Sequence, residues 1–190
     1  MPDKESESQQ IVISGVGGQG VLFVTRLLAE AAMLRGLRVF TSETHGMAQR
    51  GGTVLSHLKV GSFSSPLIRA GNANGLLALK PKNFTQHGYY LKPGSWAVVN
   101  SSQDVTAGSE ISVHAVDAES LAKQIQNPKS VNLILLGFTL AAISDTDEDN
   151  FFCHLEDIKT VIQHRMAKKK KLLDDAINAI EAGFNANVIP

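Results

Sequence analysis

Cysteine, aromatic residues and net charge are all scarce in this 190-residue sequence, and each shortage excludes a class of function. Cys153 is the single cysteine, so the chain cannot form an internal disulfide. An iron–sulfur cluster or a structural zinc site draws on several thiolates, so neither is expected here. The 18 basic and 18 acidic residues cancel, and aromatic residues make up 6%. Both values argue against nucleic-acid binding, which relies on basic surfaces and stacking aromatics.

Long hydrophobic runs are also missing. The most apolar stretch, residues 131–143, is shorter than the roughly 20 residues that a membrane span needs, and the first ten residues are polar. We therefore expect a cytoplasmic protein with no membrane contact. Residues 1–10 have no periodicity and are predicted to be a disordered tail, whereas residues 11–190 suit a single domain with a buried core.

The hydrophobic pattern begins as a strand, a glycine turn, a helix and a second strand. Residues 11–13 are a β-branched run that is typical of a buried strand. Apolar residues then recur at helical spacing over residues 19–35, and Gly36 followed by Leu37 predicts a Schellman C-cap. Residues 37–41 form the next apolar run. This order predicts a βαβ unit whose two strands pair in parallel.

The rest of the chain continues to alternate between strand and helix patterns. Strands are predicted over residues 53–60, 76–79, 96–99 and 111–116. Helices are predicted over residues 83–91, 118–126, 131–143, 154–166 and 168–183. The helix at 131–143 is apolar on all sides, which implies burial, and Ser130 precedes it as an N-cap residue. We therefore predict an α/β fold, a Rossmann-like three-layer α/β/α domain with a mainly parallel or mixed sheet.

The strongest local signal for function is a G-x-G-x-x-G motif between the first predicted strand and the first helix. Glycines let the backbone approach an anionic group, and a helix N-terminus attracts phosphate or carboxylate. The alternative is that the glycines only permit a tight turn. The predicted ligand-binding residues of this motif are Gly15, Gly17, Gly18, Gln19 and Gly20.

Glu43 adds a second hypothesis about the same motif. It lies 23 positions after Gly20, near the place where a dinucleotide-binding fold has its ribose-binding acid. A stand-alone dinucleotide-binding module is therefore one alternative function. The other interpretation of Glu43 is an exposed glutamate at a strand end.

A second glycine-rich segment follows the predicted strand at residues 37–41. Loops after parallel strands meet at one edge of a sheet, so this segment is expected to lie beside the first motif. Arginine offers a fixed fork of donors for phosphate or carboxylate, and histidine can transfer a proton near neutral pH. A single arginine or histidine is more often structural. Together with the glycines of both segments, however, they predict an anion-binding edge at which Glu43, His45 and Arg50 have supporting catalytic roles. The segment supplies His45, Arg50, Gly51 and Gly52.

Three further features are assigned structural roles. The four lysines at 168–171 are typical of a solvated helix face. His154 and His164 have no acidic or cysteine partner at ligand spacing, so no metal site is predicted there. Cys153 follows two phenylalanines and is interpreted as a small core residue.

Taken together, the segments GVGGQG (15–20) and SETHGMAQRGG (42–52) resemble a known family. They look like the gamma subunit or domain of the thiamine-diphosphate-dependent 2-oxoacid:ferredoxin oxidoreductases, and most like the beta subunit of the indolepyruvate oxidoreductases. The second segment is the more specific of the two. The resemblance spans roughly residues 11–185 and includes SPLI at 65–68, LKPG at 91–94 and Asn132.

The resemblance implies a subunit that packs against a thiamine-diphosphate-binding alpha/beta subunit. In that family the partner holds thiamine diphosphate, Mg and iron–sulfur clusters, decarboxylates the 2-oxoacid, passes electrons to ferredoxin and forms an acyl-CoA. The gamma domain is associated with closing the active site and with access of coenzyme A. A homodimer of this chain is also considered. Two positions depart from the common family pattern, since Asn74 and Lys80 stand where an aspartate and a glutamate are usual.

Three hypotheses follow from the sequence. The leading one is a supporting subunit of a 2-oxoacid oxidoreductase with no redox centre of its own, because the chain lacks the Gly-Asp-Gly and Asn-Asn pairs of a thiamine-diphosphate motif. The second is the stand-alone dinucleotide-binding module with Glu43 on the ribose. The third is an interaction protein whose glycine loops dock a partner without a ligand.

Overall fold

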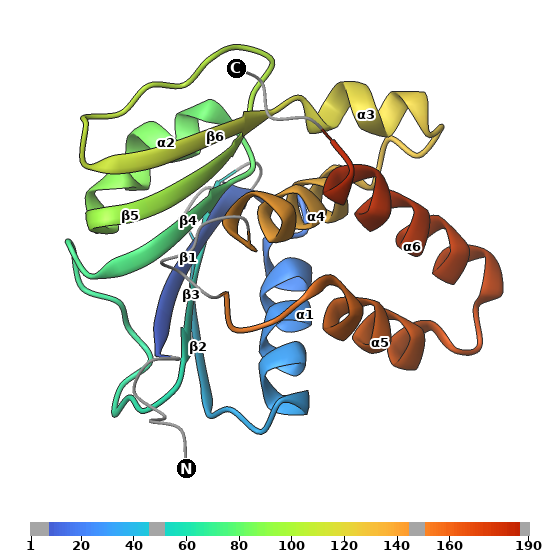
Figure 1. Ribbon diagram of the computed structural model, residues 1–190, viewed down its shortest axis with the longest axis horizontal. Coiled ribbons are helices and arrows are strands. Elements are labelled where there is room, and N and C mark those ends of the chain that lie inside the picture. Colours follow the sequence, from blue (N-terminus) through green and yellow to red (C-terminus); the bar gives the residue numbers. More distant parts are fainter. Residues whose placement is uncertain (1–7, 46–51, 145–150, 187–190) are drawn as a thin grey trace.

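The protein is built on one six-stranded mixed sheet with helices packed against it (Figure 1). The computed structural model describes residues 8–45, 52–144 and 151–186. The strand order in space is β2-β3-β1-β4-β5-β6. The strands are β1 (Gln9–Val16), β2 (Val39–His45), β3 (Thr53–Val60), β4 (Ala73–Ala78), β5 (Leu91–Asn100) and β6 (Ile111–Val116). The helices are α1 (Val21–Leu34), α2 (Pro81–His87), the 3₁₀ turn η1 (Gly88–Tyr90), α3 (Ala118–Gln124), α4 (Val131–Ser144), α5 (Leu155–Met166) and α6 (Lys170–Phe184).

Strand β3 corrects the predicted pairing of the first two strands. It lies between β1 and β2 and pairs antiparallel with both, whereas β4, β5 and β6 continue from β1 in parallel. The strands β1 and β2 therefore run in the same direction but do not pair with each other. The reason is burial: Leu58 packs on one face of β3 and Leu55 on the other, so β3 needs an interior position. Thr41 and Glu43 of β2 are exposed, as suits an edge strand.

The carboxyl ends of β1, β2, β4, β5 and β6 all lie at one edge of the sheet. The chain leaves β1 into α1 on one face and leaves β4 into α2 on the opposite face. Adjacent strands whose connections go to opposite faces leave a crevice between their ends, which is where open α/β sheets bind ligands. The loops after β1 and β4 are therefore the expected place for a ligand site.

Helix α1 matches its prediction closely. Val24, Leu27, Leu28 and Ala31 form its buried stripe. The helix ends in the expected Schellman cap, because the amide of Gly36 donates to the Met33 carbonyl and that of Leu37 donates to Ala32. The left-handed conformation of Gly36, with φ +75°, is what this cap requires.

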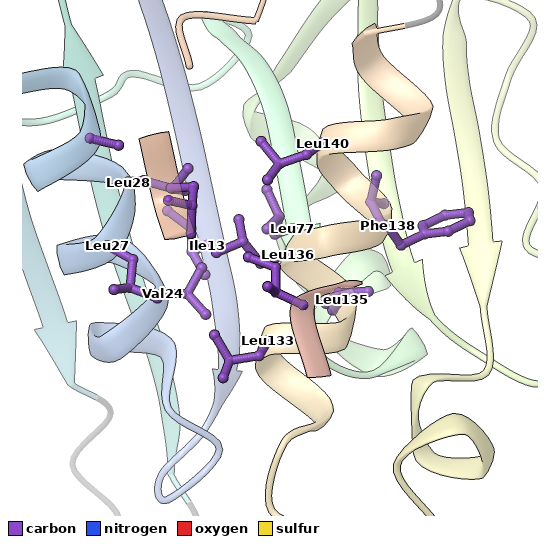
Figure 2. Packing of buried hydrophobic residues seen from close by; sticks show 14 of the residues in the cluster. Ile13, Val24, Leu27, Leu28, Leu77, Leu133, Leu135, Leu136, Phe138 and Leu140 are labelled. Carbon is purple, nitrogen blue, oxygen red and sulfur yellow. The ribbon is translucent and has the colours of Figure 1, made fainter. Parts of the chain in front are cut away.

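Helices α4 and α6 cross with almost no space between their backbones. A Cβ at Gly137 would overlap the carbonyl oxygen of Ile180, and a Cβ at Gly183 would overlap that of Ile134. Helix α4 is buried on several sides, as predicted from its apolar composition. Figure 2 shows its leucines beside Ile13 of β1, Leu77 of β4 and the inner face of α1, where they form the main core.

The opposite face of the sheet is covered more thinly. A smaller apolar cluster there includes Val12, Leu76 and Val99, with Phe84 of α2 packed against it. The arrangement is thus three-layered, with most helices on one side (Figure 1).

Several boundaries differ slightly from the prediction. Strand β1 begins at Gln9 rather than residue 11, so Gln9 and Gln10 belong to the sheet and not to a tail; residues 1–7 of the expected tail lie outside the described residues. The hydroxyl of Ser130 donates to the Asn127 carbonyl rather than capping α4. Among the described helices, none combines the length and the apolar character needed to cross a membrane.

Candidate functional site

The glycine motif forms a tight turn that is locked from within. The amide of Val16 donates to Oε1 of Gln19 at 2.7 Å, and the amide of Gln19 donates back to the Val16 carbonyl at 3.0 Å. Gly18 and Gly20 have φ angles of +92° and +82°, which favour glycine. Gly15 is required for space, because its Cβ would lie 2.7 Å from Val21 and 3.3 Å from Leu79.

The two glycine-rich segments meet, as the sequence predicted. The amide of Gly17 donates to the carbonyl of Gly52 at 3.1 Å. The amides of Gly17 and Gln19 are thus bonded inside the protein, whereas Gly18 lines a cavity. Arg50 and Gly51 lie outside the described residues, and the backbone of His45 ends β2.

A cavity of about 490 Å³ opens on the other side of the turn, at the crevice between the ends of β1 and β4. Gly18 and Gln19 form one wall and Leu79 lies at its base. The start of α4 forms the opposite wall, and the Asn132 amide lies so close to Gly20 that a Cβ there would overlap it. The N-terminal ends of α1 and α4 therefore converge on this cavity.

Two lysines give the cavity its charge. Lys123 at the end of α3 and Lys129 before α4 both line it, and Glu119 is the one acidic group among the described residues that line it. The N-terminal end of a helix carries partial positive charge, which adds to that of the lysines. The cavity can therefore accept an anionic group such as a phosphate or a carboxylate.

A second hollow of about 320 Å³ continues this edge towards β5 and β6. It shares Glu119 and Lys123 with the first cavity and adds Lys80, at the start of α2. Asp117 also lines it, and hydrogen bonds from the hydroxyl and the amide of Ser120 hold the pKa of this carboxyl below its usual value. Asp117 is thus an ionised cap of α3 rather than a proton donor.

Comparison with known proteins places this geometry in a family. Residues 10–186 match the family described as pyruvate ferredoxin/flavodoxin oxidoreductase. The chain belongs to the pyruvate ferredoxin/flavodoxin oxidoreductase family. The indolepyruvate oxidoreductase subunit IorB of Archaeoglobus fulgidus is 32% identical over 195 residues, which cover 92% of this chain and 93% of that protein. The resemblance seen in the sequence is thereby confirmed.

Solved structures of the family have the same fold. Pyruvate oxidoreductase subunit PORC of Thermotoga maritima matches with a TM-score of 0.77 and 21% identity, over 96% of this chain and 98% of that one. The 2-oxoglutarate:ferredoxin oxidoreductase of Magnetococcus marinus, solved with 2-oxoglutarate, coenzyme A and succinyl-CoA bound, matches with a TM-score of 0.75 and 20% identity. The match covers 93% of this chain, which spans only 30% of that longer one.

The inserted strand β3 bears on the role of Glu43 in this family member. A dinucleotide-binding fold holds its ribose acid on the strand next to β1, but here β3 separates β2 from β1. Neighbouring strands are about 4.8 Å apart, so Glu43 is displaced by one strand spacing from that place. The geometry therefore favours neither the dinucleotide module nor a ribose contact by Glu43.

The residues interpreted as structural occupy structural positions. Cys153 is fully buried, and burial raises the pKa of its thiol, with the charge of Asp157 adding to the effect. The lysines at 168–171 are exposed. Within the described ranges, no three His, Cys, Asp or Glu residues are grouped as a metal site would need.

Most of the cavity wall has no signal in the sequence. Lys123 and Lys129 carry no motif, and only the fold brings them to Gly18. The two residues that depart from the common family pattern lie in different places. The side-chain oxygen of Asn74 accepts a hydrogen bond from the Gln10 amide at 3.0 Å, near the start of β4. Lys80 instead lines the second hollow, at the carboxyl edge of the sheet. Lys80 is therefore the departure that can affect a ligand.

Proposed function

We propose that this chain is a supporting subunit of a thiamine-diphosphate-dependent 2-oxoacid:ferredoxin oxidoreductase that acts on an indolepyruvate-like 2-oxoacid. The observation that carries the proposal is the lysine-lined cavity at the carboxyl edge of a family fold. The chain binds and orients coenzyme A there, in the cytoplasm, and packs against the subunit that holds thiamine diphosphate, Mg and the iron–sulfur clusters. That partner supplies decarboxylation and electron transfer towards ferredoxin when its cofactors are bound.

The cavity suits the anionic part of coenzyme A. Lys123 and Lys129 can each donate to a phosphate oxygen, and charge-assisted hydrogen bonds of this kind are about twice as strong as neutral ones. Gly18 permits close approach of the backbone to the phosphate, since no atom of the described residues lies within 4 Å of its Cβ position. Lys80 and Lys123 extend the positive charge into the second hollow, which suits a ligand with separated phosphates.

Reconstitution tests the assignment as a subunit. The chain is purified with the product of its neighbouring gene, and reduction of a viologen dye is followed with indolepyruvate, 2-oxoisovalerate, pyruvate or 2-oxoglutarate plus coenzyme A. We expect turnover to need both chains and coenzyme A, with indolepyruvate preferred. Failure of the two chains to associate, or full activity without this chain, would contradict the proposal.

The lysines test the coenzyme A assignment. The double variant Lys123→Ala and Lys129→Ala removes two charged donors from the cavity. We expect its KM for coenzyme A to rise about 10- to 100-fold while kcat changes less, because the loss is one of binding. Lys168→Ala, which removes an exposed charge in the loop before α6, is the matched control and should leave both constants unchanged. An unchanged KM for coenzyme A in the double variant would show that coenzyme A does not bind in this cavity.

A further inference from the structure

A serine and a histidine join the glycine turn to the opposite face of the sheet. The hydroxyl of Ser14, on β1 just before Gly15, is hydrogen-bonded to Nδ1 of His87 at 2.8 Å. His87 is the last residue of α2, which covers the face of the sheet away from α1. Burial lowers the pKa of His87, and a hydrogen bond with the backbone of Asn83 opposes this effect. The imidazole is therefore neutral at pH 7.

Ser14 depends on this partner. The residue has no exposed surface, and it is held between Leu55 of β3 and Ala78 of β4 in the ladder. A buried hydroxyl without a hydrogen bond is unfavourable, so the position of Ser14 is coupled to the imidazole of His87.

The coupling extends from Ser14 into the cavity wall. The Ser14 carbonyl accepts from the Leu79 amide at 2.9 Å, and Leu79 lies at the base of the cavity. Gly15 follows directly, with no room for even a Cβ between Val21 and Leu79. Any shift of Ser14 is therefore transmitted to Gly15, and through Val16 to Gln19, whose side chain closes the turn.

We propose that His87 is a positioning residue that fixes the glycine turn, and hence the cavity wall, through its hydrogen bond to Ser14. The effect on the turn stands on geometry alone. Its consequence for coenzyme A binding rests on the function proposed above.

Two amide replacements of His87 distinguish the effect of its hydrogen bond to Ser14 from the effect of side-chain size. In asparagine the side-chain oxygen and nitrogen are as far along the chain as Nδ1, so His87→Asn can keep the bond to Ser14. In glutamine they extend one bond further, to the distance of Nε2, so His87→Gln cannot occupy the same place. Ser14→Ala removes the other partner and should reproduce His87→Gln, and the double variant should add nothing further.

Hydrogen exchange of the purified chain gives a readout that needs no enzyme activity. The amides to follow are those of Val16, Gly17 and Gln19, which are bonded within or next to the turn. We expect about tenfold faster exchange in His87→Gln and Ser14→Ala, and wild-type rates in His87→Asn, with α6 amides unchanged in all. Equal rates in all variants would overturn the proposal, and so would a uniform increase across the whole chain.

Kinetics of the reconstituted complex give the second readout. We expect His87→Gln to raise the KM for coenzyme A about tenfold with little change in kcat, and His87→Asn to restore it. If exchange changes as expected but the wild-type complex shows no coenzyme A dependence, the proposed function fails and the positioning role stands. If the wild-type complex is active and His87→Gln matches it in exchange and KM, the positioning role fails and the proposed function stands.

Discussion

The two faces of the sheet are stabilised by different kinds of interaction. On the face covered by α1, α4, α5 and α6, buried side chains are almost all apolar and the helices approach to backbone contact at Gly137 and Gly183. On the α2 face, polar groups lie among a smaller apolar set, and His57 and Lys59 on β3 are both buried. Apolar packing does not depend on the orientation of bonds, but it leaves no room for added volume. Hydrogen bonds depend on the orientation of donor and acceptor and on their protonation.

The glycine turn lies where both kinds of interaction end. From the helix-rich face the Asn132 amide presses on Gly20, and from the α2 face His87 holds Ser14. The turn is therefore fixed by steric contact on one side and by a hydrogen bond on the other. The two faces should therefore respond differently to added volume and to acid.

Added volume on the helix-rich face should have the largest effect. Gly183→Ala places a methyl group on the Ile134 carbonyl, so α4 and α6 must move apart along their length. We expect the free energy of unfolding to fall by at least about 3 kcal/mol, at the upper end of the cost of overpacking. Urea denaturation followed by circular dichroism measures it.

Gly108→Ala is the matched control for this variant. A Cβ at Gly108 would meet no atom of the described part of the chain within 4 Å, so the free energy of unfolding of this variant should stay within about 0.5 kcal/mol of wild type. A loss below about 1 kcal/mol in Gly183→Ala would show that the helix-rich face yields more easily than its close packing implies.

Acid should act mainly through the α2 face. Burial lowers the pKa of His57, with the charges of Lys59 and His87 adding to the effect, and burial also lowers the pKa of His87. The folded state then binds fewer protons than the unfolded state below the ordinary histidine pKa of about 6.5. Stability is complete above that pH and falls as the pH decreases, by up to about 1.4 kcal/mol per pH unit for each group.

His57→Asn tests which face carries this response. The asparagine oxygen can replace Nδ1 as the acceptor for the Ile68 amide, now at 3.3 Å, but it does not titrate. We expect a shallower loss of stability between pH 7 and pH 5 in urea titrations. The slope persists in part, because burial also lowers the pKa of His87 and that of His114, which lies beside Val98 on the helix-rich face. His164→Asn changes an exposed residue and is the control, which should keep the wild-type slope. Equal slopes in the two variants would show that His57 does not contribute to the loss of stability in acid.

Local patterns were enough to predict the elements on both faces. The stripe of α1, its Gly36 cap and the all-round burial of α4 depend on nearby residues, and they were predicted correctly. Strand order was not, because the insertion of β3 between β1 and β2 is decided by contacts between distant segments. The hydrophobic alternation of β3 indicates a strand but does not say which neighbours it has.

The site was predictable in its backbone and not in its charged side chains. The spacing of the glycines at 15, 17, 18 and 20 constrains conformation directly, so the turn was foreseen. The second glycine-rich segment was expected at the same edge of the sheet, but its contact through Gly52 follows from the antiparallel pairing of β1 with β3, which was not predicted. Lys123, Lys129 and His87 are single residues of common types in three separate segments. Their relation to the turn exists only after the sheet and α4 are assembled, so no spacing along the sequence could indicate it.

The smallest expected effect concerns the loop after α3, on the helix-rich face, where backbone conformation matters and side-chain packing does not. Gln126 follows α3 in the left-handed conformation, with φ +55°, in a second Schellman cap formed by the amides of Gln126 and Asn127. A side chain disfavours this conformation and glycine does not, so Gln126→Gly should raise the free energy of unfolding by about 0.5–1 kcal/mol. Gln124→Gly, at the last residue of α3, should lower it by up to about 1 kcal/mol, because glycine weakens a helix and this position has no left-handed conformation to relieve. Urea midpoints at constant slope measure both. If Gln126→Gly were destabilising instead, the Gln126 side chain would have to make a contact worth more than the backbone strain, and the helix-rich face would depend on a polar contact as the α2 face does.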